Sequence, residues 1–221
     1  MKKIKIIDTN EYVEVRKILC LGRNYAEHAK EMNAPTPKQP VIFMKPSTAI
    51  INGDEKIIRP SISKEMHHEI ELVVVISKDG NNIPQEKAYA HIAGYAVGLD
   101  MTLRDLQSDA KKQGLPWTLA KGFDTSAPLS DIAPISNIPN PHSLRMICSV
   151  NGEVRQNGNT REMIFSIPHI IEYISKYISL EIGDLIFTGT PEGVSEVKPG
   201  DMIEAEIVGI GKITHEVAGE E

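Results

Sequence analysis

One segment restricts the possible folds of this 221-residue chain more than any other: the run from Ile70 to Ile76, with two glutamates at its start. The run is rich in β-branched residues, which is typical of a strand. Residues 72–76 are all apolar, so we expect the strand to be buried on both faces. Residues two apart on a strand point to the same side, so Glu69 and Glu71 would place two carboxylates next to each other.

Buried carboxylates are costly unless a cation neutralises them, so we predict a metal ion at Glu69 and Glu71. Because no cysteine cluster accompanies them, the ion would be hard, Mg²⁺ or Mn²⁺. Asp100, at the end of an apolar run, is the best candidate for a third ligand, although such an aspartate is more often a turn or helix cap. Two alternatives stay open. The glutamates could face water at a sheet edge, and a zinc site with His68 is a weaker option.

A second group with possible chemistry is the pair His28 and Glu31. They are three residues apart in a segment from Tyr25 to Met32 whose composition favours a helix, so they would share one helix face. A histidine that a carboxylate orients is a natural general base. The alternative is an ordinary pair on a solvent-exposed helix.

Several cations could hold an anionic ligand. Lys121 follows a mostly apolar stretch, where a lysine either extends its ammonium to the surface or binds an anion. Arg23, Lys45 and Arg104 are further candidates, and each could instead be a solvated surface charge. The segment from Gly189 to Gly193 could present backbone N–H groups to an anion, but it is not a P-loop.

Strands outnumber helices in the rest of the pattern. We expect strands at 18–21, 41–44, 92–99, 144–150, 153–156, 185–188, 202–208 and 212–217, and helices at 25–32, 104–112 and 163–178. Because strands and helices do not alternate regularly, a doubly wound parallel sheet is not expected. The pattern favours a strand-rich α+β fold, a mixed β-roll or β-barrel-like arrangement with peripheral helices. Residues 1–16 would form a short arm or strand, and residues 17–221 a single domain.

Composition excludes several classes of function. The formal net charge of −6 gives no general attraction for nucleic acid or anionic membranes, so we expect neither as a partner. The start of the chain lacks the apolar stretch of a signal peptide, and the longest uncharged stretch contains three prolines. Cys20 and Cys148 lie in apolar runs and are expected to be core thiols. We therefore predict a cytoplasmic globular protein.

Six motifs occur together and in a specific order. They are GRNYAEH at 22–28, FMKPS at 43–47, HHEIE at 67–71, GLDMTLRD at 98–105, LPWTLAK at 115–121 and TGTPEGV at 188–194. In this combination the chain resembles the fumarylacetoacetate hydrolase superfamily, in its short acylpyruvate hydrolase and oxaloacetate decarboxylase branch. The resemblance implies the β-roll of the family's C-terminal domain, a homodimer, and one Mg²⁺ or Mn²⁺ ion per subunit.

The resemblance also implies roles for individual residues. Glu69, Glu71 and Asp100 match the metal ligands, and His28, Glu31 and Lys121 match the catalytic residues, with the first two on a segment that acts as a lid. Arg23, Tyr25, Lys45, Ser47, Arg104, Gln107 and Thr190 fall at or near substrate-contacting positions.

The implied reaction is hydrolysis of the C3–C4 bond of a small acylpyruvate, a 2,4-dioxo acid, to pyruvate and a carboxylic acid. Three alternatives stay open. The same site could decarboxylate oxaloacetate, or it could isomerise a substrate of the 2-hydroxyhepta-2,4-diene-1,7-dioate type. The last alternative is a protein that binds a metal and a keto acid without catalysis.

Overall fold

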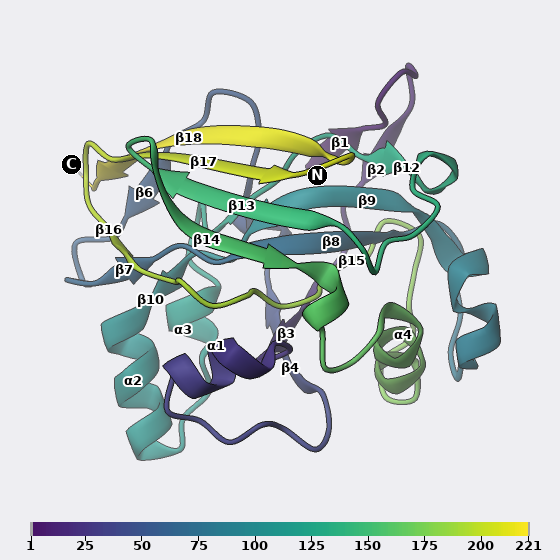
Figure 1. Cartoon of the computed structure of the whole chain (residues 1–221), viewed down its shortest axis with the longest axis horizontal. Helices are drawn as coiled ribbons and strands as arrows, with labels where there is room; N and C mark the ends of the chain where they lie inside the picture. Colours follow the sequence, from purple (N-terminus) through teal and green to yellow (C-terminus); the bar gives the residue numbers. More distant parts are fainter. Residues whose placement is uncertain (1, 221) are drawn as a thin grey trace.

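The computed structural model describes residues 2–220, and two mixed β-sheets dominate it (Figure 1). The six-stranded sheet has the order β12 (Ala133–Pro134), β9 (Ile92–Leu99), β8 (Ile70–Ile76), β15 (Leu185–Phe187), β3 (Ile18–Gly22) and β4 (Val41–Lys45). The five-stranded sheet has the order β14 (Glu153–Asn159), β13 (Arg145–Val150), β17 (Met202–Ile207), β18 (Gly211–Gly219) and β6 (Ile57–Arg59). Within the described residues the sheets are open layers, not a closed barrel.

Shorter elements surround these sheets. Small sheets pair β1 (Lys3–Lys5) with β2 (Tyr12–Glu14), β5 (Ile50–Ile51) with β11 (Ala127–Pro128), and β7 (Met66–His67) with β10 (Thr102–Leu103) and β16 (Glu196–Val197). The α-helices are α1 (Ala26–Glu31), α2 (Arg104–Gln113), α3 (Thr118–Lys121) and α4 (Ile167–Ser175). Short 3₁₀ helices are η1 (Ser47–Ala49), η2 (Gln85–His91), η3 (Ile135–Asn137) and η4 (Thr160–Glu162). Figure 1 shows α1, α2 and α3 grouped at one end of the sheets and α4 apart from them. The predicted strand-rich α+β fold with peripheral helices is confirmed.

Strand β8 is buried on both faces, as predicted. All seven of its residues are buried. Leu72 and Val74 belong to the core between the two sheets, whereas Val73 and Val75 belong to a second core on the opposite face of the six-stranded sheet. The alternation of a strand therefore divides one apolar run between two cores.

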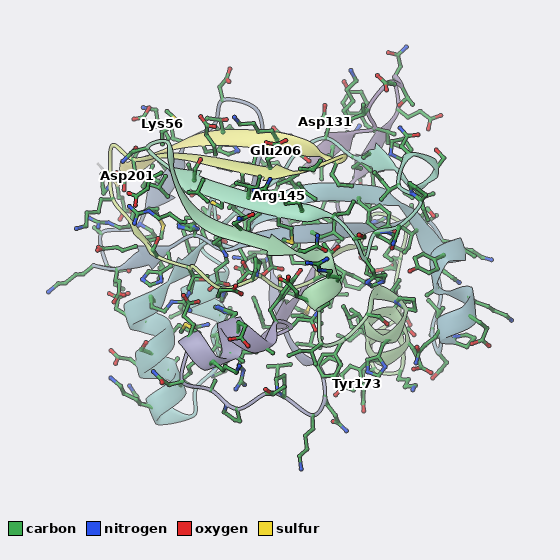
Figure 2. All side chains as sticks on the ribbon, viewed as in Figure 1. Lys56, Asp131, Arg145, Tyr173, Asp201 and Glu206 are labelled. Carbon is green, nitrogen blue, oxygen red and sulfur yellow. The ribbon has the colours of Figure 1, made fainter. Side chains whose placement is uncertain are left out.

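The five-stranded sheet has its other face in water. Along β17, Ile203 and Ala205 are buried in the core, whereas Glu204 and Glu206 point outwards. Figure 2 shows Glu206 and Arg145 on this outer face. A sheet with one solvated face is common among antiparallel strands.

Glycine and asparagine occur where the backbone turns tightly or where two segments approach closely. Asn151 and Gly152 join β13 to β14 with φ angles of 52° and 80°, the positive values that a tight hairpin turn requires. In β9, a Cβ added at Gly94 would lie 2.1 Å from the carbonyl oxygen of Ala133, and Gly98 is similarly crowded by Phe187. At these two positions of the strand the neighbouring segments leave no room for a side chain.

The helix predicted at 163–178 is wrong at both ends, because α4 covers only Ile167–Ser175. The backbone N–H of Ile164 donates to the carbonyl of Asn24 at 2.8 Å, and that of Phe165 donates to Asn24 Oδ1 at 2.7 Å. These tertiary hydrogen bonds hold the start of the segment in an extended form, although its apolar spacing suits a helix.

Within the arm expected at 1–16, β1 and β2 form an antiparallel pair, and Ile4 and Val15 are buried in the second core. Cys20 and Cys148 are free and buried, as predicted. Among residues 2–220, no helix has both the length and the apolar character needed to cross a membrane.

Candidate active site

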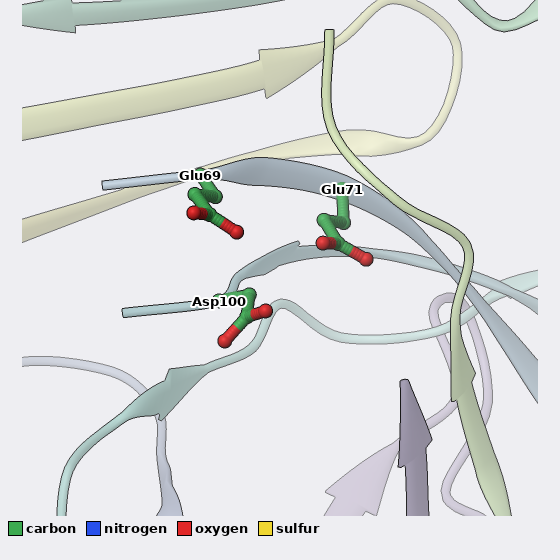
Figure 3. A group of neighbouring side chains, drawn as sticks. All are labelled: Glu69, Glu71 and Asp100. Carbon is green, nitrogen blue, oxygen red and sulfur yellow. The ribbon is translucent and has the colours of Figure 1, made fainter. Parts of the chain in front are cut away.

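Three acidic side chains meet at the end of β8 and β9 (Figure 3). Glu69 precedes β8, Glu71 lies within it, and Asp100 directly follows β9. The strands are antiparallel, with Glu71 opposite Gly98, so Asp100 lies next to Glu69. One oxygen from each carboxylate lies within 4.8 Å of the others, and all three residues are buried. The structure thus brings together the three predicted ligands.

Cations from three other segments surround this acidic triad. Nζ of Lys121, at the end of α3, lies 2.8 Å from Glu69 Oε2 and 2.6 Å from Asp100 Oδ2. Nζ of Lys45, at the end of β4, lies 2.8 Å from Asp100 Oδ1. Arg104, the first residue of α2, forms an ion pair with Glu69. Three carboxylates therefore face three cations in a buried setting, where unpaired charges would be costly.

The electrostatic environment separates the two glutamates. Burial raises the pKa of Glu71 well above its usual value, and the neighbouring Asp100 and Glu69 carboxylates raise it further. Burial alone would also raise the pKa of Glu69, but Lys121 and Arg104 outweigh that effect and hold the pKa well below its usual value. The cations thus neutralise Glu69 more completely than Glu71.

Two features of the triad fit a divalent metal ion. Glu71 Oε2 accepts the backbone N–H of Gly189 at 2.7 Å, but no ammonium or guanidinium group forms an ion pair with Glu71 among the described residues. Asp100 Oδ1 is buried beside the Lys45 ammonium, yet it accepts no hydrogen bond within residues 2–220. An all-oxygen ligand set with one uncompensated carboxylate suits Mg²⁺ or Mn²⁺. Glu69, Glu71 and Asp100 would hold the ion.

The predicted pair on α1 is assembled as well. His28 Nδ1 lies 3.1 Å from Glu31 Oε2, and Glu31 Oε1 accepts the backbone N–H of Gly193 at 3.0 Å. Burial works to raise the pKa of Glu31, but the hydrogen bonds from His28 and Gly193 bring it below its usual value. An ionised carboxylate can only accept, so Nδ1 of His28 is the donor in this contact, and in the neutral ring Nε2 would keep its lone pair. His28 is therefore in the tautomer that a general base requires.

A cavity of about 30 Å³ lies between α1, α2 and the triad. Nine of the predicted site residues line it: Arg23, His28, Glu69, Glu71, Asp100, Arg104, Gln107, Lys121 and Thr190. Glu31 and Lys45 lie behind this lining, where they contact His28 and Asp100. Leu21, Gly22, Met32, Phe43, Lys111 and Trp117 complete the wall.

Besides Lys45, two further predicted substrate contacts do not line the cavity. The Tyr25 side chain is buried in the core, and its hydroxyl donates to Met146 Sδ at 3.3 Å. Ser47 is half-buried at the start of η1 and does not line the cavity. His68 also lies outside the acidic cluster, because strand alternation directs it to the opposite side, where it contacts Gln156. The weaker zinc alternative is therefore not supported.

Sequence reasoning missed Lys111 as a cavity residue. Its Nζ donates to Gln107 Oε1 at 3.1 Å and lies 5.2 Å from the centre of the Trp117 ring. Burial lowers the pKa of Lys111 to about 8, and the positive charge of Arg104 contributes. Lys111 follows Gln107 by four residues on one helix, and this spacing was the available signal.

Comparisons with known proteins agree with this geometry. The family model described as fumarylacetoacetate (FAA) hydrolase C-terminal matches residues 17–218. The mitochondrial oxaloacetate tautomerase FAHD1 of Mus musculus is 52% identical over 195 residues, which are 88% of each chain. The mitochondrial oxaloacetate decarboxylase of Dictyostelium discoideum is 47% identical over 196 residues, or 88% of this chain and 90% of that protein.

A solved structure has nearly the same fold. The crystal structure of fumarylpyruvate hydrolase from Pseudomonas aeruginosa, in complex with Mn²⁺ and pyruvate, superposes with a TM-score of 0.95 at 39% sequence identity. The match covers 99% of this chain and 96% of that one.

Proposed function

This chain belongs to the fumarylacetoacetate hydrolase family, and from that membership we propose that it is a divalent-metal-dependent enzyme that forms the enolate of a small 2-oxo acid. Its preferred reaction is the interconversion of the keto and enol forms of oxaloacetate. The observation that carries this proposal is the position of the His28 base on a cavity that has an excess of positive charge.

The charges around the cavity favour a ligand with two negative charges. The formal charges of the three carboxylates and of Lys45, Lys121 and Arg104 sum to zero, although none of these cations pairs with Glu71, so a bound divalent ion would add two positive charges. Arg23 and Lys111 also line the cavity, and neither forms an ion pair within residues 2–220. Oxaloacetate carries two carboxylates, whereas acetylpyruvate carries one. Complementary charge therefore favours the dicarboxylic acid.

His28 performs the proton transfer. Its Nε2 removes a proton from C3 of the keto acid, the electron pair of the C–H bond forms the C2=C3 double bond, and negative charge moves to the C2 oxygen. Protonation of that oxygen gives the enol, and the reverse sequence gives the keto form. Glu31 stabilises the positive charge on the imidazole while it holds the proton. Lys121, fixed by Asp100 and Thr102, presents an ammonium beside the triad that stabilises charge on the enolate. A bound Mg²⁺ or Mn²⁺ would supply Lewis-acid polarisation of the 2-oxo group.

Hydrolysis of acylpyruvates is the second candidate function. The similarity to fumarylpyruvate hydrolase favours it, and the same base serves it. His28 would take a proton from water, the hydroxide would add to C4, and the C3–C4 bond would break with its electron pair passing to the pyruvate enolate. Protonation at C3 then gives pyruvate. Decarboxylation of oxaloacetate breaks the corresponding C3–C4 bond without an attacking water, so it needs the base least.

One set of assays separates these reactions. The protein is treated with EDTA and supplied with Mg²⁺ or Mn²⁺, and the decay of enol-oxaloacetate absorbance and the release of pyruvate are followed with oxaloacetate and with acetylpyruvate. Reactions with metal alone give the background. We expect rapid metal-dependent conversion of the enol that Glu69→Ala and His28→Ala both abolish.

Other outcomes point elsewhere. Faster pyruvate release from acetylpyruvate than enol conversion would move hydrolysis to first place. Decarboxylation that persists in His28→Ala would remove the base from the main reaction. Absence of all turnover, with metal still bound, would leave a binding protein.

A further inference from the structure

A buried glutamine outside the cavity lining connects the two sides of the candidate active site. Gln156 lies in β14, on the five-stranded sheet, and has no exposed surface. Its Oε1 accepts the backbone N–H of Ile70 at 3.1 Å and lies 3.0 Å from His68 Nδ1. Its Nε2 donates to Thr190 Oγ1 and to the carbonyl of Pro191, both at 2.8 Å. One amide thus joins the start of β8 to the segment that contains Thr190.

The direction of these hydrogen bonds is fixed by the groups at both ends. The backbone N–H of Ile70 can only donate and the carbonyl of Pro191 can only accept, so the amide of Gln156 has one orientation. Oε1 therefore accepts from His68 Nδ1, and the Ser195 hydroxyl lies 3.0 Å from the other ring nitrogen.

This orientation determines what Thr190 can do. Because Thr190 Oγ1 accepts from Gln156, its own hydroxyl proton is directed elsewhere. Within residues 2–220 that proton has no acceptor, and Thr190 lines the cavity with 2% of its surface exposed. The hydroxyl is therefore available as a donor to an oxygen atom of a bound ligand.

Hydrogen bonds hold the segment that contains Thr190 at three points. Just before it, Gly189 donates its N–H to Glu71 Oε2, and just after it, Gly193 donates to Glu31 Oε1. Gln156 holds the carbonyl of Pro191 between these two points. A Cβ at Gly158 would lie 2.5 Å from Pro191 Cβ, so β14 and this segment are in close contact. The glutamine supports both the acidic triad and the general base.

We propose that Gln156 is a positioning residue that makes the Thr190 hydroxyl a hydrogen-bond donor to the oxyanion of the bound 2-oxo acid. The proposal rests on the proposed function, because the oxyanion is the one formed by enolisation. A donor fixed in place before the reaction stabilises charge as it develops. The interaction is strongest in the transition state, so its loss lowers kcat and kcat/KM together.

The sharpest test reverses the hydrogen bond. In Gln156→Glu, a carboxylate can still accept from Ile70 and His68, and it loses the donor to the Pro191 carbonyl. It would also accept from the Thr190 hydroxyl and turn its proton away from the cavity. We expect kcat to fall about 10- to 100-fold, the range typical of residues that orient an active-site group. The matched control is Asn157→Asp, which adds the same charge on the outward side of β14. It should keep kcat within about twofold, the scatter of a neutral surface change.

A second variant separates positioning from a structural role. Gln156→Met removes both ends of the contact and leaves Ile70 and His68 without partners, whereas Gln156→Glu places an unpaired carboxylate beside the Pro191 carbonyl, so both variants should lower Tm. A structural role predicts that kcat per folded site falls in both variants. The positioning role predicts that Gln156→Met keeps most of its kcat per folded site, because the methionine leaves the Thr190 proton free to reach the ligand. A loss of kcat in Gln156→Met equal to that in Gln156→Glu would overturn the proposal.

Thr190 itself completes the test without relying on the stability of the Gln156 variants. Thr190→Ser keeps the hydroxyl and should retain most of kcat, whereas Thr190→Val should lose about as much as Gln156→Glu. In the double variant the losses should not add, since both remove one donor. Full additivity, or equal loss in the serine and valine variants, would overturn the proposal. If the wild type binds oxalate but converts no 2-oxo acid, the proposed function is wrong. If the wild type is active and the losses in the double variant are additive, the proposed function stands and the role proposed for Gln156 is wrong.

Discussion

Asp100 donates its backbone N–H to the carbonyl oxygen of Glu69 at 2.8 Å, so the hydrogen-bond ladder between β8 and β9 ends on two members of the acidic triad. Glu71 is held by the next positions of the same ladder, opposite Gly98. The triad is therefore positioned by sheet register, which is more rigid than a loop. Lys121, Arg104 and His28 approach it from helices outside this sheet.

Glu71→Gln should separate metal binding from folding. The amide keeps the acceptor for the Gly189 N–H but removes a charge. In the wild type, Mn²⁺ at 100 times its Kd should stabilise the fold by about 2.7 kcal/mol and so raise Tm. In Glu71→Gln we expect this rise in Tm to disappear. Without metal, Tm should stay equal or rise, because burial, Asp100 and Glu69 all raise the pKa of Glu71 and disfavour its charged form. Thermal denaturation with and without Mn²⁺ measures both effects, with the exposed Glu206→Gln as control. An undiminished Mn²⁺ shift would exclude Glu71 as a ligand.

Glu31→Gln should inactivate His28 without removing it. An amide that turns its NH₂ group towards Nδ1 favours the tautomer with the proton on Nε2, which cannot act as a base. We expect kcat to fall about 10²- to 10⁴-fold, the usual contribution of a general base. Mn²⁺ affinity, measured by calorimetry, should not change. The control is Glu27→Gln, which alters an exposed carboxylate on the same helix and should leave kcat intact.

Lys111→Met should change substrate preference. The substitution keeps the alkyl packing on Trp117 and removes a positive charge from the cavity wall. We expect kcat/KM for oxaloacetate to fall about tenfold, in line with the loss of one charged hydrogen bond, and that for monoanionic acetylpyruvate to fall less. Lys112→Met, at the next position of α2 and outside the cavity lining, is the control. Equal losses for both substrates would contradict the assignment of Lys111 to a second carboxylate.

Asp105 should make the stability of α2 depend on pH. Burial would raise its pKa, but hydrogen bonds from Ser63 and from the backbone of Lys64 and Leu106 bring the pKa below its usual value of 3.8. A carboxyl with a lowered pKa stabilises the fold above its usual pKa, and the effect is lost as pH falls through the lowered value. Asp105→Asn should therefore be less stable than wild type in urea at pH 7 and lose that difference in strong acid. Asp109→Asn should show no such trend, and a pH-independent deficit for Asp105→Asn would contradict the linkage.

Gly98→Ala should destabilise the sheet that carries the triad. The new Cβ would lie 2.6 Å from both a ring carbon of Phe187 and a methyl carbon of Val73. Overpacking of this kind costs about 1–3 kcal/mol, which urea denaturation would detect. Gly211→Ala in β18 is the control, because its nearest neighbouring atom is 4.0 Å away. Equal stability of both variants would show that β8, β9 and β15 can adjust around the methyl group.

The parts of the site that were predictable from the residues are those that depend on local geometry. Glu69 and Glu71 share a face because strand residues alternate, and His28 and Glu31 share a face because helix residues three apart do. The position of Asp100 followed from an apolar run that ends in a carboxylate. The resemblance to a known family added Gln107 and Thr190, and the structure brings both to the cavity.

Contacts between distant segments could not be predicted in this way. Gln156 approaches the site from β14, whose sequence EVRQNGN has no alternation of polar and apolar residues that would mark the glutamine as buried. Tyr25, directly before α1, turns into the core, where its hydroxyl donates to Met146 Sδ. The homodimer, the cytoplasmic location and the choice between Mg²⁺ and Mn²⁺ stay predictions.

The burial of β8 on both faces has a consequence for how this protein can change during evolution. A single inserted or deleted residue near Glu69 would exchange the two faces of the strand, so the carboxylates would enter the core and apolar side chains would enter the site. Such a change would destroy folding and chemistry in one step. The helices that supply His28 and Lys121 lie outside the sheet ladder and carry no such restriction. New substrate preferences can therefore arise by lengthening or exchanging those helices, while β8 tolerates substitutions only.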